Sequence, residues 1–172
     1  MDVRTRLIVL LLILAVVAIL AIWSRLQPAE TTVSVYFIRT LGNQSTVEAT
    51  SRFERARGVV SLLTAAIEEL LEGPMPAEQL RGLTTAIPKG TRLRSVQIRD
   101  GVVLVDLSRE VESGGGSSSM LGRLWQIVYT ATQFPEASKV RILIDGQDRE
   151  AMGGEGVIID RPLERPAEPP RF

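Results

Sequence analysis

Residues 126–146, QIVYTATQFPEASKVRILIDG, show most clearly how this chain is built. Their first half completes a helical pattern, because apolar residues recur at spacings of three and four and so lie on one face. Pro135 ends the helix, since proline does not fit a helix interior. Residues 140–144 then predict a strand, which Asp145-Gly146 closes with a turn. A helix with one apolar face that leads into a strand indicates a helix covering a sheet.

The remaining chain supplies the other parts of such a layer. Gly73-Pro74 stops one helix, and Asp100-Gly101 is typical of a hairpin turn. The loop at 112–119 ends in serines that are suited to cap the next helix. The expected elements are strands at 33–38, 47–53 (at a sheet edge), 93–98, 102–107, 140–144 and 157–159, and helices at 58–72 and 120–132. The sequence therefore predicts an α+β fold, with a small, mostly antiparallel sheet covered on one face by two helices.

The composition limits the functions that this chain can have. Its 172 residues suffice for one compact domain with appendages. Lys and Arg together number 20, as do Asp and Glu, so no net charge attracts nucleic acid. The absence of cysteine and histidine excludes disulfides, thiolate chemistry and hydrolases built on Ser–His or Cys–His pairs. We therefore expect no enzyme activity, no cofactor and no metal site.

The N-terminal run from Leu7 to Trp23 is apolar at every position. At about 17 residues it lies at the short end of what spans a bilayer, and its tryptophan suits the interface. Arg4 and Arg6 precede the run and Arg25 follows it, which favours a cytoplasmic N-terminus. A cleaved signal peptide is the alternative, although tryptophan stands where cleavage requires a small residue. We expect a single-pass anchor in the cell membrane, with the following domain on the extracytoplasmic side.

These features divide the chain into four parts. Residues 1–25 form the signal anchor, 26–32 a linker, 33–161 the folded domain and 162–172 a proline-rich tail. Since proline is frequent in the tail, we expect it to be extended and disordered. The stretch at 75–90 is expected to be irregular, because glycine and proline interrupt it.

Asp106-Leu107-Ser108 is the first candidate site, since it places a carboxylate beside a hydroxyl nucleophile. Without histidine, the simpler interpretation is a strand end whose Asp106 and Ser108 bind backbone amides. An acid-dependent hydrolase that uses carboxylates such as Asp106 or Asp145 is the enzyme hypothesis that stays open.

Three further groups suggest binding sites. Asp145, Asp148 and Glu150 offer oxygen ligands for calcium, but their spacing differs from that of a calcium loop, and a solvated turn is the simpler interpretation. The triple glycine at 114–116 lacks the lysine of a phosphate loop and indicates a flexible hinge. Three aromatic residues are too few and too embedded in apolar patterns to form a platform for sugars or bases: Tyr36, Trp125 and Tyr129. Trp125 indicates core.

Several segments, in this order and spacing, resemble the GerMN domain, a family named after a sporulation and germination protein of spore-forming bacteria. These segments are Val35-Tyr36-Phe37, Leu70-Leu71-Glu72-Gly73-Pro74, Ile87-Pro88-Lys89-Gly90-Thr91, Val105-Asp106-Leu107-Ser108, Ile127-Val128-Tyr129-Thr130, Phe134-Pro135 and Ile144-Asp145-Gly146. Together they extend over nearly the whole part of the chain that follows the apolar run.

The resemblance implies an extracytoplasmic, membrane-held module without a known catalytic reaction. The family is similar in fold to ring-building domains of secretion-type assemblies, which implies binding to envelope proteins or self-association. Two features differ from relatives: the chain has no cysteine for a lipid anchor, and one copy fits where the namesake carries the domain twice. A binding module for a cell-wall glycan or small ligand is the alternative function.

Overall fold

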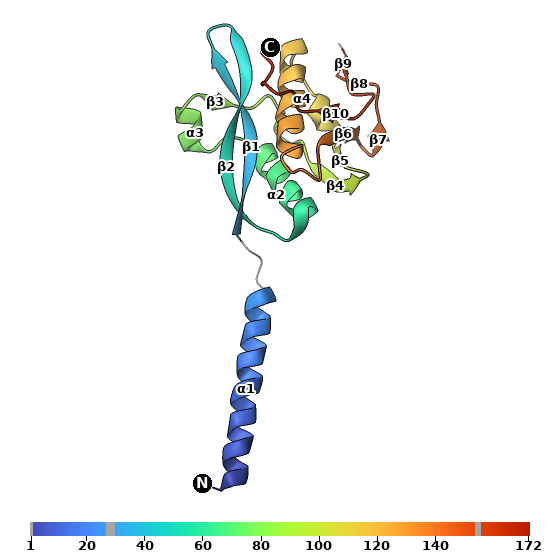
Figure 1. Cartoon of the computed structure of the whole chain (residues 1–172). Coiled ribbons are helices and arrows are strands. Elements are labelled where there is room, and N and C mark those ends of the chain that lie inside the picture. The colour runs from blue at the N-terminus through green and yellow to red at the C-terminus, as the bar shows by residue number, and fades with distance from the viewer. Residues whose placement is uncertain (1, 27–29, 154–155) are drawn as a thin grey trace.

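The computed structural model describes residues 2–26, 30–153 and 156–172, without the side chains of residues 3, 5–7 and 24–26. Figure 1 shows an N-terminal helix that stands apart from a folded domain. The elements in chain order are α1 (Val3–Leu26), β1 (Glu30–Leu41), β2 (Gln44–Arg55), α2 (Gly58–Glu72), α3 (Pro76–Leu80), β3 (Leu83–Thr84), β4 (Leu93–Arg99), β5 (Val102–Leu107), the 3-10 helix η1 (Arg109–Glu112), α4 (Ser117–Ala131), β6 (Lys139–Ile144), β7 (Gln147–Asp148), β8 (Ala151–Met152), β9 (Val157–Ile158) and β10 (Leu163–Glu164).

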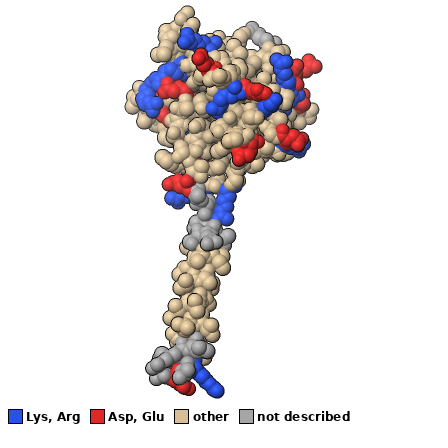
Figure 2. Space-filling model, in the orientation of Figure 1, with Lys and Arg blue, Asp and Glu red and all other residues tan. Residues whose placement is uncertain are grey.

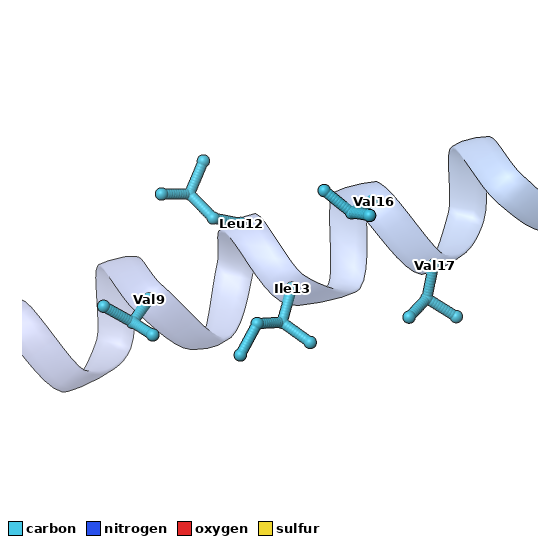
Figure 3. A pocket seen from close by; sticks show the side chains of 5 residues that line it. All are labelled: Val9, Leu12, Ile13, Val16 and Val17. Atoms are coloured by element: carbon cyan, nitrogen blue, oxygen red, sulfur yellow. The ribbon is translucent and has the colours of Figure 1, made fainter.

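Helix α1 contains the apolar run that was expected to cross a membrane. Its side chains at 8–23 are apolar and exposed, and Figure 2 shows this stem without charge between its ends. A shallow groove on α1, drawn in Figure 3, is lined by Val9, Leu12, Ile13, Val16 and Val17. The run at 8–23 is about 24 Å long, less than the ~30 Å of a bilayer core.

Within the described part of the chain, no helix combines the length and the apolarity needed to cross a membrane. The spanning helix expected from Leu7 to Trp23 is therefore not found there. The side chains of Leu7 and Arg25, which belong to that prediction, lie outside the described residues.

Strands β1 and β2 form a long antiparallel hairpin. Every residue is paired, from Glu30 opposite Arg55 up to the turn. β3 joins the other side of β1, which leaves β2 at the edge of a three-stranded sheet. The edge position predicted for 47–53 is thus confirmed. β1 begins inside the expected linker at 26–32, of which residues 27–29 lie outside the described residues.

A second sheet has the strand order β10-β6-β5-β4, and β7 also pairs with β6. β4 and β5 form the predicted hairpin, with Arg99 opposite Val102. β5 and β6 are parallel, so they need a crossover connection, which α4 provides. The α+β class is confirmed, but the single sheet is wrong, because the β1–β2 hairpin and the later strands form separate sheets.

Helices α2 and α4 lie between the hairpin and the second sheet, as Figure 1 shows. Helix α2 has the predicted bounds, and its apolar face is buried. The main core contains side chains from both sheets and both helices. Burial of each large aliphatic side chain there stabilises the fold by about 1.5–3 kcal/mol. Fully buried side chains from these four parts include Phe37, Leu63, Ile127 and Ile142.

A polar stripe of α4 completes the edge of β1. Gln126 and Thr130 of α4 and Gln133, which follows directly after its C-cap, point to β1, and the first two are fully buried. The Gln126 side chain donates to the Tyr36 carbonyl at 3.2 Å, and the Tyr36 N–H donates to Thr130 Oγ1 at 3.2 Å. The Gln133 amide bonds both the N–H and the carbonyl of Ser34, at 2.8 and 3.0 Å. Side chains thus take the place of a neighbouring strand along this part of β1.

Candidate functional site

Asp106 and Ser108 lie at the end of β5 and bind backbone groups. Asp106 Oδ1 accepts the Gly146 N–H at 2.8 Å, and its Oδ2 accepts from Arg94 Nε at 3.1 Å. Ser108 Oγ accepts the Arg92 N–H at 2.9 Å. Both residues are buried. The predicted role of Asp106 and Ser108 as backbone ligands at a strand end is confirmed.

The carboxylates around the β6–β7 turn take part in ion pairs. Asp145 lies 3.7 Å from a guanidinium nitrogen of Arg94, and Asp148 pairs with Arg141 across the turn. In the residues that the structure describes, no three acidic, histidine or cysteine side chains are grouped to hold a metal ion. The structure therefore does not bring Asp145, Asp148 and Glu150 together as a calcium site.

The triple glycine at 114–116 is tied to helix α4 by Arg123. This guanidinium is buried and donates to the carbonyls of Gly114 at 2.6 Å, Val111 at 2.8 Å and Ala86 at 2.9 Å. Burial lowers the pKa of Arg123. Helix α4 begins at Ser117 with Gly116 as its N-cap, so the serine cap expected before residue 120 is wrong. The helix starts earlier because the carbonyl of Gly116 already accepts the N–H of residue 120.

Two of the aromatic residues, Tyr36 and Tyr129, contact one arginine side chain. The rings of Tyr36 and Tyr129 are 5.2 Å apart, and Trp125 meets Tyr129 edge to face. The guanidinium of Arg165 lies 5.0 Å from the centroid of the first ring and 4.9 Å from that of the second. Trp125, predicted as core, is partly buried and packs against the main core, and Tyr129 is buried.

Arg165 belongs to residues 163–172, which we call the C-terminal strap. The strap starts with β10 on the edge of β6. The Tyr129 hydroxyl donates to the Pro166 carbonyl at 2.8 Å, and the backbones of Phe172 and Ser45 bond each other at 2.9 and 3.0 Å. The tail was expected to be disordered, and this is wrong, because its backbone and Arg165 find partners on β6, α4 and the hairpin.

Helix α3 and its N-cap present apolar side chains to the outside; we call residues 74–85 the α3 surface. Leu80 is 90% exposed and Met75 is 47% exposed, at the two ends of the helix. A shallow pocket beside them is lined by Pro74, Gln79, Leu83, Thr84 and Thr85. Concave, partly apolar pockets are where proteins bind other molecules, so this pocket with Leu80 and Met75 beside it is the candidate binding surface.

A buried ion-pair network fixes the α3 surface to the hairpin. Two nitrogens of Arg52 contact the two carboxylate oxygens of Glu78 at 2.6 and 2.8 Å, and its Nε donates to Glu69 of α2 at 2.7 Å. Glu78 also accepts the Met75 N–H at 2.8 Å and the Thr50 hydroxyl. These hydrogen bonds, that of Arg52 above all, lower the pKa of Glu78 to about 2. The network thus joins β2, α2 and α3.

Sequence reasoning missed this network, because residues 75–90 were expected to be irregular. One local signal was present: Pro76 stands at the first helical position, and Glu78 reaches back to the N–H of Met75. The partner Arg52 is 26 positions away, so local spacing does not reveal it.

Comparisons with known proteins agree on one family. A family model described as "Sporulation and spore germination" (Germane) matches residues 34–150. Spore germination protein GerM of Bacillus subtilis is 30% identical over 110 residues, which cover 62% of this chain and 29% of GerM. The chain therefore spans less than a third of that relative.

Two solved structures have the same fold. The tandem GerMN domains of the sporulation protein GerM from Bacillus subtilis match with a TM-score of 0.66 and 25% identity, over 80% of this chain and 46% of that one. A putative lipoprotein from Clostridium perfringens matches with a TM-score of 0.57 and 28% identity, over 80% and 89%. With its family match over most of the sequence, the chain belongs to the Germane family of GerMN domains, whose description is sporulation and spore germination.

Proposed function

We propose that this chain is a non-catalytic module of a bacterial cell envelope that binds a partner protein through the α3 surface. We propose further that residues 7–23 attach it to the cell membrane, with the domain on the extracytoplasmic side. The family relationship supports sporulation or germination as the process in which this proposed interaction takes part.

The observation that carries the interaction role is the combination of Leu80 with the network beneath it. Leu80 is 90% exposed, although the neighbouring Glu78 is held by two charge-assisted bonds to buried Arg52. Because this ion-pair network already holds the short helix in place, binding through Leu80 costs little conformational entropy. The pocket floored by buried Leu83 offers a place for an apolar side chain of the partner.

Charge and composition favour a protein over nucleic acid. Figure 2 shows basic and acidic side chains interspersed over the visible face of the domain, and acids and bases balance in the whole chain. Nucleic-acid surfaces need a concentration of positive charge, which such a pattern does not supply.

Membrane attachment is supported by α1. Its side chains at 8–23 are all apolar and all exposed, and the large ones are 41–63% exposed. Contact of this apolar surface with water is unfavourable, and lipid would remove it. Trp23, 62% exposed at the end of the run, is the residue type enriched at membrane interfaces.

Photo-crosslinking in cell membranes tests the interaction role. A photoreactive amino acid replaces Leu80, or Glu136 as a control, which is exposed in the loop before β6. We expect a protein adduct from position 80 and none from position 136. An excess of the unlabelled chain should compete for the adduct, and an excess of the Leu80→Glu chain should not.

Two results would contradict the interaction role. Equal adducts from positions 80 and 136 would mean that contact is unspecific. Binding of the full chain to purified peptidoglycan, with the same affinity in the Leu80→Glu chain, would instead favour the glycan-binding alternative and a different surface.

Fractionation tests the attachment and the side of the membrane separately. We expect the full chain to stay with membranes in alkaline carbonate, and its domain to be digested by protease added outside intact spheroplasts. Deletion of residues 8–23 should release the domain. Protection from external protease would refute the extracytoplasmic location.

A further inference from the structure

Phe53 is an exposed aromatic residue close to α1 along the chain. Its side chain is 73% exposed, on the edge strand β2 and two residues before that strand ends. It pairs with Thr32 of β1, and the hairpin ends at the pair Glu30–Arg55. Phe53 thus lies at the open end of the hairpin, where the chain arrives from α1.

The chain between α1 and the hairpin is short. Residues 27–29 separate Leu26 from Glu30, and four Cα–Cα steps reach at most about 14 Å. Figure 1 shows the open end of the hairpin and the loop leading into α2 turned towards α1. The headgroup layer of a bilayer is about 5–8 Å thick on each side. An end of the domain that is tethered so closely to an apolar helix is within reach of lipid headgroups.

The residues at this end suit a membrane surface, and we call Glu30, Ser51, Phe53 and Arg55 the basal face. Phe53 supplies an aromatic ring of the kind that enters the boundary between headgroups and acyl chains. Arg55 and Glu30 form an ion pair at 3.5 Å and are 75% and 56% exposed, so both charges stay accessible to headgroups. Ser51 is exposed on the same side of β2, one pleat farther from the tether.

We infer that the open end of the hairpin, which carries the basal face, rests on the lipid surface with the Phe53 ring among the headgroups, and that the domain therefore has a fixed orientation on the membrane. The inference rests on the proposed attachment through residues 7–23. In this orientation the turn of the hairpin and helix α3 are held away from the bilayer, on the side where Figure 1 shows them.

Leu41 provides a matched control for Phe53. It is also 73% exposed and also belongs to the hairpin, but it lies beside the turn at the opposite end. The nine residue-to-residue steps from Thr32 to Leu41 correspond to about 30 Å of extended strand. The exposed fraction is thus equal at the two sites of one hairpin, and the distance from the tether differs.

The chain has no cysteine, so single cysteines can carry a fluorescent label. Full chains labelled at Ser51→Cys, Leu41→Cys or Leu12→Cys are reconstituted in vesicles of phosphatidylethanolamine and phosphatidylglycerol that contain nitroxide lipids. We expect headgroup nitroxides to quench the label at position 51 at least threefold more than the label at 41. When Phe53→Ser is added to the chain labelled at position 51, most of the difference in quenching between positions 51 and 41 should disappear.

The label at position 12 separates the two proposals. Quenching there by acyl-chain nitroxides, with equal quenching at 51 and 41, would overturn the basal contact and leave the attachment intact. No quenching at position 12 would refute the attachment itself. Because Phe53 is exposed, Phe53→Ser should keep the circular dichroism of the parent, and unchanged quenching at 51 in that variant would also overturn the inference.

Discussion

Replacement of Glu78 by glutamine probes the network that holds the α3 surface. Glu78→Gln keeps the size of the side chain and removes the charge that faces buried Arg52. Arg52 keeps one carboxylate, that of Glu69 at 2.7 Å, but loses its paired contact at 2.6 and 2.8 Å. We expect the domain to fold and to be less stable, because a buried guanidinium is left with incomplete compensation.

The size of the effect follows from the pKa of Glu78. Hydrogen bonding lowers this pKa from 4.5 to about 2, and each unit corresponds to about 1.4 kcal/mol. A carboxylate whose folded pKa is depressed stabilises the fold fully above the unfolded pKa, and the contribution is lost as the pH falls through the folded pKa. Glu78 thus contributes about 3 kcal/mol at pH 7, a contribution that declines below pH 4.5 and is under about 1 kcal/mol at pH 2.

Urea unfolding of the full chain in a nonionic detergent, followed by circular dichroism, measures this effect. We expect Glu78→Gln to lower the free energy of unfolding by about 3 kcal/mol at pH 7, and the two chains to converge near pH 2. Glu136→Gln, at an exposed site, is the control and should change it by less than about 0.5 kcal/mol. A difference between Glu78→Gln and the parent that is the same at pH 7 and pH 2 would refute the reasoning.

Two further substitutions test other contacts. Arg165→Ala removes stacking on two tyrosine rings, and we expect the free energy of unfolding in urea to fall by about 1–2 kcal/mol and amide exchange at Phe172 to become faster. Unchanged exchange at Phe172 would mean that Arg165 does not hold the strap. Gln126→Leu leaves the Ala86 N–H and the Tyr36 carbonyl without their side-chain partner, and we expect the free energy of unfolding to fall by about 2–4 kcal/mol. A fall below about 1 kcal/mol would contradict the role of the polar stripe.

Local pattern was sufficient to predict the elements whose signals lie within a few residues. Helix α2 has its predicted bounds, because an apolar face repeats through it and Gly73-Pro74 ends it. The β4–β5 hairpin was predicted for a similar reason, since Asp100-Gly101 forms the turn and Asp100 has a positive φ of 50°. Asp106 and Ser108 were correctly predicted as backbone ligands, because short polar side chains at a strand end have few other uses.

Contacts between distant residues were not predictable in this way. The sequence pattern predicted one apolar face for α4 but no partners for Gln126 and Gln133. Both side chains form hydrogen bonds with the backbone at the edge of β1. These side chains occupy the edge of β1, and β1 and the later strands form separate sheets, so the single predicted sheet was wrong. Arg165 likewise reaches Tyr36 over 129 positions, and composition alone made the strap look disordered.

Consecutive residues of β2 connect the two proposed surfaces. Arg52 and Phe53 point to opposite faces, because side chains alternate along a strand. Arg52 is buried and holds Glu78 of α3, whereas Phe53 is exposed at the basal face. Since one strand carries both, any contact that orients Phe53 on the membrane also orients Leu80 of the α3 surface. Loosening the ion pair by Glu78→Gln should therefore weaken partner binding at Leu80 and leave the contact of Phe53 with lipid unchanged.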